Sequence, residues 1–382
     1  MPDKNSKKKI IFYRPTWVEV NVGAIAYNFR QVRRIVGSRV KILAVVKADA
    51  YGHGMREVSQ ALHGCGADYF GVACIDEAIE LRKLGITKPI LIFESIPTHF
   101  AAEIINHNLI PTISVIPLAD AINRYAKKRK KIARVHIKVD TGMGRLGVWH
   151  IEALDFIKAI NAFSHLKIEG IYTHFSSADT DSEFTKQQIG DFKKLKTLIE
   201  AHKISIPLYH AANSMGVIAY PESHFDLVRP GLMLYGLYPR KGLTKKVTLK
   251  PAMSFKTKVM YVKHVSAGRS ISYGRTYVTK RNTIIATLPV GYNDGYPRCL
   301  SNNAEVLLNG KRYKIAGRVC MDQLLIDVGS RSNVKINDLV TLLGNDEGGC
   351  ISADELAEKA GTISYEIVCA LGKAKNRRHI TS

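Results

Sequence analysis

Short apolar runs alternate with longer amphipathic stretches between residue 40 and about residue 230 of the chain. Runs of this length are typical of buried strands, and the stretches between them are typical of helices that cover a sheet. The strand candidates are residues 42–46, 69–73, 90–93, 111–115, 135–139, 168–173, 208–211 and 227–228, with a further apolar run at 232–237. Eight such units in roughly 200 to 250 residues favour an α/β fold with a (β/α)8 TIM-like barrel, although the count does not exclude an open doubly wound sheet.

The pattern changes after about residue 248. Apolar runs there are short, and turn residues such as Asn309-Gly310 separate them, as in a mainly β domain. A last helical segment at 353–361 follows Ser352, a residue type that caps helix N-termini. We therefore expect a barrel domain over residues 1–247, which includes an N-terminal extension, and a mainly β domain over residues 248–382.

The composition places the chain outside a membrane. Hydrophobic residues make up 46% of the chain, yet no apolar run approaches the roughly 20 residues that span a bilayer. The apolar run at 10–13 is too short for a secretory signal, so we expect a cytoplasmic protein. The six cysteines are scattered and the histidines form no metal-binding motif, so we expect reduced thiols and no metal site.

A formal net charge of +23 raises the possibility of a nucleic-acid partner. The basic residues are spread over the whole chain, however, and the densest run, at 127–131, lies where a polar helical segment ends. A solvated helix end explains such a run, so we expect no nucleic-acid function. The charge fits either the general composition of the host's proteins or the attraction of anionic ligands such as a phosphate ester.

Polar and ionisable residues recur where the predicted barrel strands end, and that edge of a βα barrel is where active sites lie. They are Lys47, Lys138, Asp140, His174, Asn213, Ser214 and Arg229. Lys47 ends an apolar strand, where partial desolvation lowers an ammonium pKa and makes the amine a better nucleophile toward an aldehyde. The alternative is a strand-end lysine whose stem packs on apolar surface while its ammonium reaches water.

The string V-V-K-A-D-A-Y-G-H-G at 45–54 resembles the cofactor-lysine signature of alanine racemases, and the similarity continues through nearly the whole chain. These are fold type III enzymes that use pyridoxal 5'-phosphate. The resemblance implies that Lys47 is the cofactor lysine and that the other cofactor-binding residues are Tyr51, His174, Asn213, Ser214, Arg229, Gly231, Leu232 and Tyr365. It also places the Arg229 guanidinium at the pyridine nitrogen, where it donates a hydrogen bond and gives up no proton.

Residues 138–145, K-V-D-T-G-M-G-R, resemble a second racemase motif. The resemblance implies that Lys138 is carbamylated and orients Arg145 toward the substrate, because a carbamate is an anion able to hold a guanidinium. An ordinary ion pair between Lys138 and Asp140 is the alternative. The same segment contains G-x-G-x-x-G at 142–147, a weak dinucleotide-binding fingerprint because it follows the fifth predicted strand and contains Arg145.

Three strings of the second domain, at 271–276, 290–296 and 317–322, resemble the C-terminal signatures of the same family. The resemblance implies a homodimer in which Tyr273 reaches the other subunit's cofactor on the face opposite Lys47. Racemisation needs a base on each face, so Lys47 would serve the α-proton of the D-substrate and Tyr273 that of the L-substrate. The remaining implied positions are the Met321 amide with Arg145 at the substrate carboxylate, and Tyr292, Tyr365 and Asp322 around the access route. The alternative for Tyr273 is a hairpin tyrosine that packs on its neighbours.

The expected function is therefore interconversion of L-alanine and D-alanine, which supplies D-alanine for peptidoglycan. A broad-spectrum or serine racemase is the nearest alternative. A fold-related decarboxylase would need an acidic residue where Arg229 stands. A cofactor-carrying binding protein built on the same barrel would lack the second domain with Tyr273, and a basic nucleic-acid protein is the most distant alternative.

Overall fold

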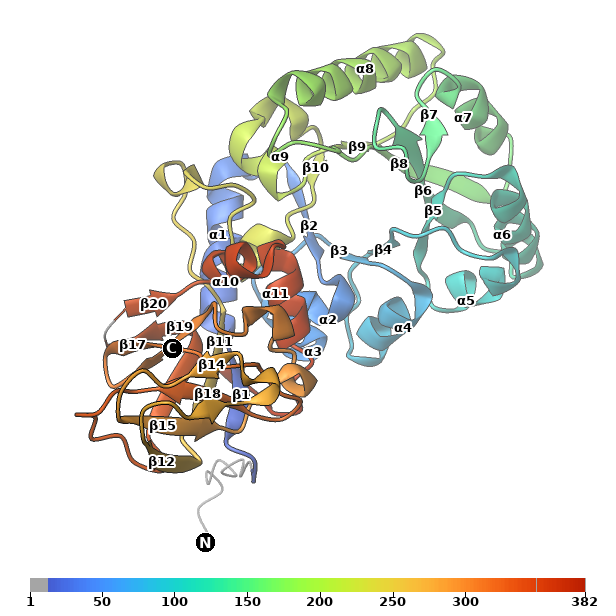
Figure 1. Cartoon of the computed structure of the whole chain (residues 1–382). Coiled ribbons are helices and arrows are strands. Elements are labelled where there is room, and N and C mark those ends of the chain that lie inside the picture. The colour runs from blue at the N-terminus through green and yellow to red at the C-terminus, as the bar shows by residue number, and fades with distance from the viewer. Residues whose placement is uncertain (1–12, 348, 382) are drawn as a thin grey trace, which may run out of the picture. The chain divides into compact units, whose positions relative to one another are not determined.

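The computed structural model describes residues 13–347 and 349–381. They form two compact units (Figure 1). One unit comprises Val22–Ala252, and the other comprises the described residues before Val22 together with Met253–Thr381. The expected barrel domain, residues 1–247, differs from the first unit at its N-terminal end, because the strand before Val22 pairs with strands of the second unit.

The first unit is built on a ring of parallel strands, drawn from blue to yellow-green in Figure 1. The strands are β2 (Lys41–Val45), β3 (Tyr69–Val72), β4 (Ile90–Ile92), β5 (Ile110–Ile113), β6 (Ala133–Asp140), β8 (Leu166–Tyr172), β9 (Leu208–His210) and β10 (Leu227–Val228). They pair in the order β10-β2-β3-β4-β5-β6-β8-β9, and β7 (Val148–Trp149) pairs with β6. Between β9 and β10 the Asp226 amide donates to the Tyr209 carbonyl (3.0 Å) and the Arg229 amide donates to the Ala212 carbonyl (2.9 Å).

All eight predicted strands are present among the described residues, and the expected (β/α)8 barrel is confirmed. The ninth apolar run forms the short 3-10 helix η3 (Leu232–Tyr235), which ends at Gly236 in the left-handed region. Periodicity alone does not distinguish a short buried strand from a short buried helix. Inside the ring, apolar side chains from several strands pack together, among them Leu43, Leu91, Ile110 and Leu208.

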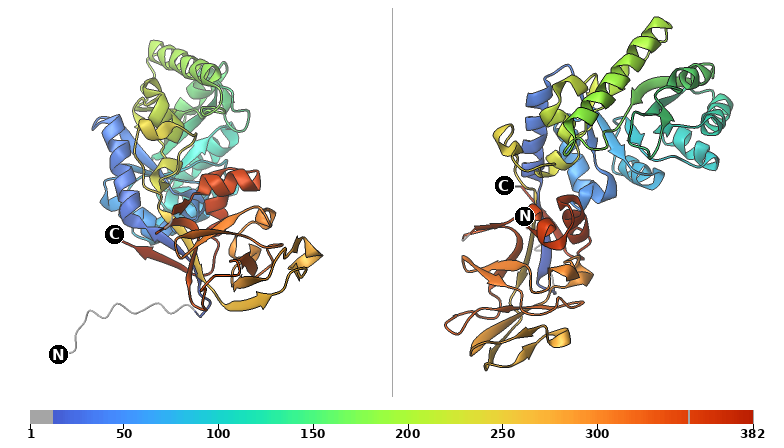
Figure 2. Two further views of the ribbon diagram at one scale, coloured as in Figure 1. Left: turned by 60° about the vertical axis from the view of Figure 1, so that its left-hand side comes forward. Right: turned by 45° about the horizontal axis from the view of Figure 1, so that its top comes forward.

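Helices cover the outside of the ring (Figures 1 and 2). They are α1 (Val22–Val36), α3 (Met55–Gly64), α4 (Ile75–Lys83), η1 (Thr98–Phe100), α5 (Ala101–Asn106), α6 (Ile116–Lys128), α7 (Ala153–Asn161), α8 (Ser182–Ala201), α9 (Ser214–Ala219), η2 (Pro221–Ser223) and η4 (Leu243–Lys245). The short segment α2 (Lys47–Tyr51), which follows β2, has a left-handed backbone instead. In α8 the buried positions include Gln188, Phe192, Leu195 and Ile199, which share one face at helical spacing. No helix in the described part of the chain is long and apolar enough to span a bilayer.

The second unit is mainly β, as expected. Its strands are β1 (Thr16–Asn21), β11 (Met253–Lys258), β12 (Tyr261–Val265), β13 (Ser270–Ile271), β14 (Tyr277–Val278), β15 (Thr283–Leu288), β16 (Glu305–Leu308), β17 (Lys311–Lys314), β18 (Leu324–Asp327), β19 (Leu339–Asp346), β20 (Gly349–Ile351) and β21 (Arg377–Ile380). The largest sheet has the order β17-β16-β19-β11-β1-β21. Asn309 and Gly310 both have positive φ (48° and 72°), which is the backbone of a tight hairpin between β16 and β17.

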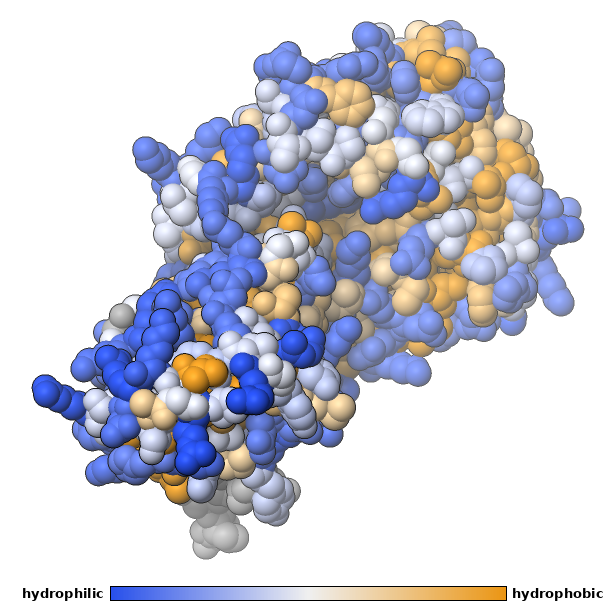
Figure 3. All heavy atoms as spheres, viewed as in Figure 1, coloured by the Kyte–Doolittle hydropathy of each residue, from blue (hydrophilic) through white to orange (hydrophobic). Residues whose placement is uncertain are grey.

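Short helices complete this unit. They are η5 (Tyr273–Arg275), η6 (Tyr292–Asp294), η7 (Arg298–Leu300), α10 (Ala353–Ala360) and α11 (Ser364–Leu371). The Ser352 hydroxyl accepts a hydrogen bond from the Glu355 amide (3.0 Å), so the predicted N-cap of α10 is present. Hydrophilic side chains are distributed over both units on the face that Figure 3 shows.

Candidate active site

The turn that follows β2 places Lys47 at the carboxyl edge of the barrel strands. Ala48, Asp49, Ala50 and Tyr51 all have positive φ, between 51° and 56°. Residues other than glycine adopt this conformation at a cost of about 1–2 kcal/mol each, so the surroundings must hold it. The Glu77 carboxylate does so by accepting hydrogen bonds from the amides of Ala48 (2.6 Å) and Ala73 (2.8 Å).

Arg229 is buried directly after β10, with 4% of its surface exposed. Its guanidinium donates to the carbonyls of Thr173 (2.6 Å) and Ala211 (3.0 Å) and lies 3.3 Å from His174 Nδ1. Burial lowers the pKa of Arg229 to about 10, so the side chain remains a cation at neutral pH. A positive charge with a fixed direction therefore lies at the rim of the barrel.

Two buried histidines extend this network into the barrel. Arg229 Nη1 lies 2.9 Å from His210 Nδ1, and His210 Nε2 lies 2.9 Å from His136 Nδ1. Because a guanidinium only donates, His210 Nδ1 must accept, so its proton is on Nε2 and points at His136. Burial first, and then the Arg229 charge, holds the pKa of His210 well below its usual range. Burial lowers the pKa of His136 to about 3, so both rings are neutral at physiological pH.

Four basic side chains lie near enough to His174 to act on its pKa. Burial is the largest cause of its strongly lowered pKa, and the charges of Arg229, Lys138, Arg145 and Lys47 add to it, in that order. The residues come from different strand ends, so the structure brings together side chains that the sequence only placed at one edge. Such a concentration of positive charge suits an anionic ligand.

Lys138 is buried, with 4% of its surface exposed. Its ammonium donates to the Val139 carbonyl (3.2 Å) and lies 5.4 Å from the centre of the Tyr172 ring. Burial is the main reason that its pKa is lowered to about 7, with Arg229 acting in the same direction and Asp140 against it. A substantial fraction of this lysine is therefore an uncharged amine at neutral pH.

Asp140 organises the loop that carries Arg145. Its carboxylate accepts hydrogen bonds from the amides of Gly142 (2.8 Å), Met143 (2.7 Å) and Gly144 (2.8 Å). An ordinary ion pair between Lys138 and Asp140 was the alternative to a carbamylated Lys138. Among the described residues no ion pair of 4.0 Å or less joins these two side chains, so this alternative is wrong. The dinucleotide interpretation is also wrong, because the loop leads into β7 rather than into the helix that such a fingerprint requires.

A set of uncharged polar groups follows β9 and β10. The Ser214 hydroxyl accepts from the amides of Gly231 (3.0 Å) and Met233 (3.2 Å), and the Asn213 side chain caps α9 by accepting from the Gly216 amide (3.0 Å). A Cβ added at Gly231 would lie 2.5 Å from the Tyr51 hydroxyl, so glycine at this position lets the Tyr51 phenol approach the backbone. Leu232 follows, buried at the first position of η3.

The second unit holds the other predicted residues on three loop segments and a helix. The amides of Tyr292 and Asn293 donate to the carbonyls of Cys320 (3.1 Å) and Met321 (3.0 Å), which joins the loop with Tyr292 to the loop with Met321 and Asp322. The Ser272 hydroxyl donates to the Arg318 carbonyl (2.7 Å) and so anchors the segment that carries Tyr273 to the same loop.

Tyr273, Tyr292 and Met321 are exposed by 69%, 42% and 54% of their surfaces. The exposure of Tyr273 does not fit a hairpin tyrosine that packs on its neighbours. Tyr365 lies in the first turn of α11 and is partly buried.

Two family models cover most of the chain. Alanine racemase, N-terminal domain, matches residues 20–239, and Alanine racemase, C-terminal domain, matches residues 252–379. The chain belongs to the alanine racemase family. It is 46% identical over 368 residues to the alanine racemase of Halothermothrix orenii, with 96% of this chain and 97% of that one covered. It is 43% identical over 358 residues to the alanine racemase of Methanococcus maripaludis, with 93% and 96% covered.

Solved structures of racemases share the architecture of both units. The alanine racemase of Clostridium difficile 630 superimposes with a TM-score of 0.90 at 34% identity and covers 98% of this chain and 97% of its own. The alanine racemase from D-cycloserine-producing Streptomyces lavendulae gives a TM-score of 0.92 at 33% identity, with 97% and 98% covered.

The structure adds residues to this racemase site that the sequence did not single out. His136 contacts His210, and Tyr172 stacks on His210 with ring centres 4.8 Å apart. The alternation of His136, Lys138 and Asp140 along β6 is a usable signal, because every second residue of a strand faces the same side. The role of Glu77 had no such signal, since it lies on the helix after the next strand.

Proposed function

We propose that this chain interconverts L-alanine and D-alanine, with pyridoxal 5'-phosphate bound at the rim of the barrel. The observation that carries the proposal is the set of basic side chains near His174, with Arg229 3.3 Å from its Nδ1, beside the Ser214 hydroxyl and the Gly231 amide. When bound, the cofactor would supply an electron-withdrawing ring that stabilises negative charge on the substrate α-carbon.

The residues present fit that cofactor. Lys47 offers an amine for its aldehyde, and His174 offers a neutral ring surface beside its ring. The Tyr51 hydroxyl lies close against the Gly231 backbone, and the Ser214 hydroxyl bonds the Gly231 amide, so uncharged hydroxyl and amide groups that suit a phosphate gather here. We assign the binding of the cofactor's phosphate to these groups together with the Leu232 amide, Asn213 and Tyr365.

Arg229 would hold the pyridine nitrogen by donating a hydrogen bond. Because a guanidinium keeps its proton, the nitrogen stays unprotonated and the ring withdraws electrons less strongly. A weaker electron sink favours return of the proton to the same carbon and so favours racemisation over transamination. The bonds to the carbonyls of Thr173 and Ala211 keep the guanidinium in one orientation.

Two bases are assigned to the two faces of the substrate. Lys47 would remove or return the α-proton on one face, and Tyr273 of the partner subunit would do so on the other. In this homodimer, Arg145 and the Met321 amide would bind the substrate carboxylate, while Tyr292, Tyr365 and Asp322 border the access route. The exposure of Tyr273, Tyr292 and Met321 within the described chain supports their presentation to a second subunit.

We also propose that Lys138 is carbamylated. Its amine nitrogen would bond to the carbon of CO2 and lose a proton, which leaves a carbamate anion. The lowered pKa of about 7 provides the uncharged amine that this reaction requires. The anion would offset the charges of Arg229 and Arg145 and hold the Arg145 guanidinium.

The test is D-alanine formation from L-alanine by the purified full chain, with and without added cofactor and with L-serine as the competing substrate. Lys47→Ala and Tyr273→Ala should each abolish it. Mixing the two inactive variants should restore about a quarter of wild-type activity, because half of the random dimers are mixed and each then has one intact site. Subunit exchange without restored activity would contradict the shared site.

Supply of D-alanine for peptidoglycan, a cytoplasmic location and the lack of nucleic-acid or membrane partners stay predictions. Growth of a D-alanine-requiring bacterial strain on expression of this chain tests the biosynthetic role. Cell fractionation and binding to DNA, RNA and lipid vesicles at several salt concentrations test the others.

A further inference from the structure

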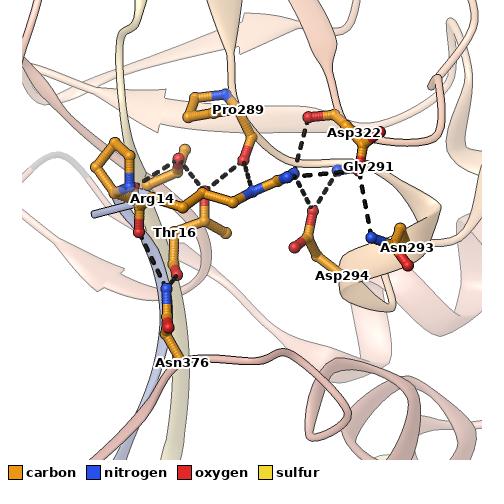
Figure 4. Close-up of polar contacts among 10 residues, drawn as sticks. Arg14, Thr16, Pro289, Gly291, Asn293, Asp294, Asp322 and Asn376 are labelled. Carbon is orange, nitrogen blue, oxygen red and sulfur yellow. Dashed lines mark hydrogen bonds and ion pairs between the residues drawn. The ribbon is translucent and has the colours of Figure 1, made fainter. Parts of the chain in front are cut away.

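Arg14 lies just before β1 and joins two loops of the second unit (Figure 4). Its guanidinium donates to the Asp294 carboxylate (2.6 Å) and to the Asp322 carbonyl (2.9 Å). It also donates to the Pro289 carbonyl (3.1 Å), and its third nitrogen is 3.4 Å from the Asp322 carboxylate. One side chain therefore contacts both the loop that carries Tyr292 and the loop that carries Met321.

Hydrogen bonds to the backbone of Arg14 and its neighbours hold this residue in place. The Asn376 side chain donates to the carbonyls of Arg14 and Thr16 (both 3.0 Å), and the Thr16 hydroxyl donates to the Pro289 carbonyl (2.5 Å). The guanidinium thus extends from a segment that leads directly into β1, a strand of the largest sheet in this unit. A group fixed in this way can fix the loops that it contacts.

The two loops depend on each other for their shape. Gly291 lies against the backbone of Cys320 and Met321 so closely that a Cβ at that position would overlap it. Asp294 is buried, with 4% of its surface exposed. One oxygen of its carboxylate accepts hydrogen bonds from both the Gly291 amide (3.0 Å) and the Arg14 guanidinium. A shift of Asp294 would therefore move Gly291 and the neighbouring Tyr292.

Charge gives Arg14 a second effect on these loops. Asp294 and Asp322 are both acidic, and the Asn293 side chain, at 3.2 Å from the Asp322 carboxylate, is neutral. Two carboxylates without a cation would repel the carboxylate of the substrate, and the Arg14 guanidinium offsets their charge. A lysine could replace the charge but not the planar set of donors that reaches acceptor groups on three residues.

We propose that Arg14 is a positioning residue for the substrate carboxylate: it fixes the loop with the Met321 amide against the loop with Tyr292 and offsets the carboxylates of Asp294 and Asp322. The proposal rests on the proposed function, which names alanine as the substrate and the Met321 amide as a group that binds its carboxylate. It assigns no contact between Arg14 and the substrate.

The test compares Arg14→Ala and Arg14→Lys with the control Arg312→Ala. Arg312 lies in the same unit, pairs with Glu305 (3.1 Å) and Glu355 (2.7 Å), and has a side chain that is 37% exposed against 34% for Arg14. Loss of either arginine should lower the unfolding temperature of the full-length protein. Only Arg14→Ala should raise KM for L-alanine, by about tenfold, with a smaller fall in kcat, because a displaced binding group weakens substrate positioning.

Two further measurements separate positioning from general stability. Hydrogen exchange of peptides covering 289–295 and 318–323 should rise in Arg14→Ala and stay at the wild-type level in Arg312→Ala. Arg14→Lys should recover part of the KM effect through its charge but leave the exchange raised. Asp294→Asn added to Arg14→Ala should lower KM again, because it removes an unpaired carboxylate while an amide oxygen still receives the Gly291 amide.

An unchanged KM and unchanged exchange in Arg14→Ala, with a racemising wild-type protein, would overturn the proposal. An equal rise of KM in Arg312→Ala would overturn it as well, since the effect would then be one of stability. If the wild-type protein does not racemise alanine, the proposed function fails, and the exchange measurement still decides whether Arg14 holds the two loops.

Discussion

Replacing Glu77 with alanine is expected to release the left-handed turn that follows Lys47. Four residues of this turn, Ala48 to Tyr51, have positive φ, so the conformation costs on the order of 4–8 kcal/mol in total. The Glu77 carboxylate offsets part of this by binding the amides of Ala48 and Ala73, and each hydrogen bond to a charged acceptor contributes about 1.5–3 kcal/mol. Because Glu77 is partly exposed, water replaces some of this loss, and we expect about 3 kcal/mol of destabilisation.

The assay measures urea unfolding of the full chain and, by absorbance titration, the affinity for pyridoxal 5'-phosphate. Glu77→Ala should weaken cofactor binding by about tenfold or more, because part of the binding energy must then reorder the turn that carries Lys47. Glu77→Gln keeps one acceptor oxygen and should lose roughly half as much stability. Glu80→Ala is the control, since Glu80 is an exposed residue of the same helix.

The reasoning is refuted if Glu77→Ala and Glu80→Ala have the same stability and the same cofactor affinity. The left-handed turn would then be held by its other contacts, such as the bond from the Met55 amide to the Asp49 carboxylate (2.7 Å). A loss of stability with unchanged cofactor affinity would also contradict it, since the turn would then have no effect on Lys47.

Three further outcomes are expected. As pH falls from 6.5 toward about 3, unfolded His136 binds a proton that the folded protein excludes, so stability should fall by about 1.4 kcal/mol per pH unit, and His136→Gln should reduce that slope in acid unfolding curves. Isotope-labelled bicarbonate should give a carbamate signal in carbon NMR that Lys138→Ala removes; retention of the signal would place it elsewhere. Asp140→Asn should raise KM for alanine by about tenfold through disorder of the loop with Arg145, and equal KM values would refute this.

The fold was largely predictable because strands of a parallel barrel are buried on both faces and therefore read as continuous apolar runs. The same property left the type of element at 232–237 open, because a buried apolar run there forms the 3-10 helix η3. The pairing of β1 with β11 and β21 was not predictable, because periodicity identifies a strand but not the strands beside it. That long-range pairing is why the described residues before Val22 join the second unit.

The residues of the candidate site also fall into those that the sequence could predict and those that it could not. Lys47, Lys138 and Arg229 could be found because strand ends in a barrel share one edge, so position along the chain implies position in space. Glu77 and Arg14 act on backbone groups that lie 29 and more than 270 residues away from them in sequence. No local pattern distinguishes such residues from ordinary surface charges, since what sets them apart is the acceptor or donor they meet after folding. Groups that would touch the substrate can thus be predicted from their chemistry and their position at the end of a strand. The groups that hold them in place can be identified only from the contacts that they make in the folded protein.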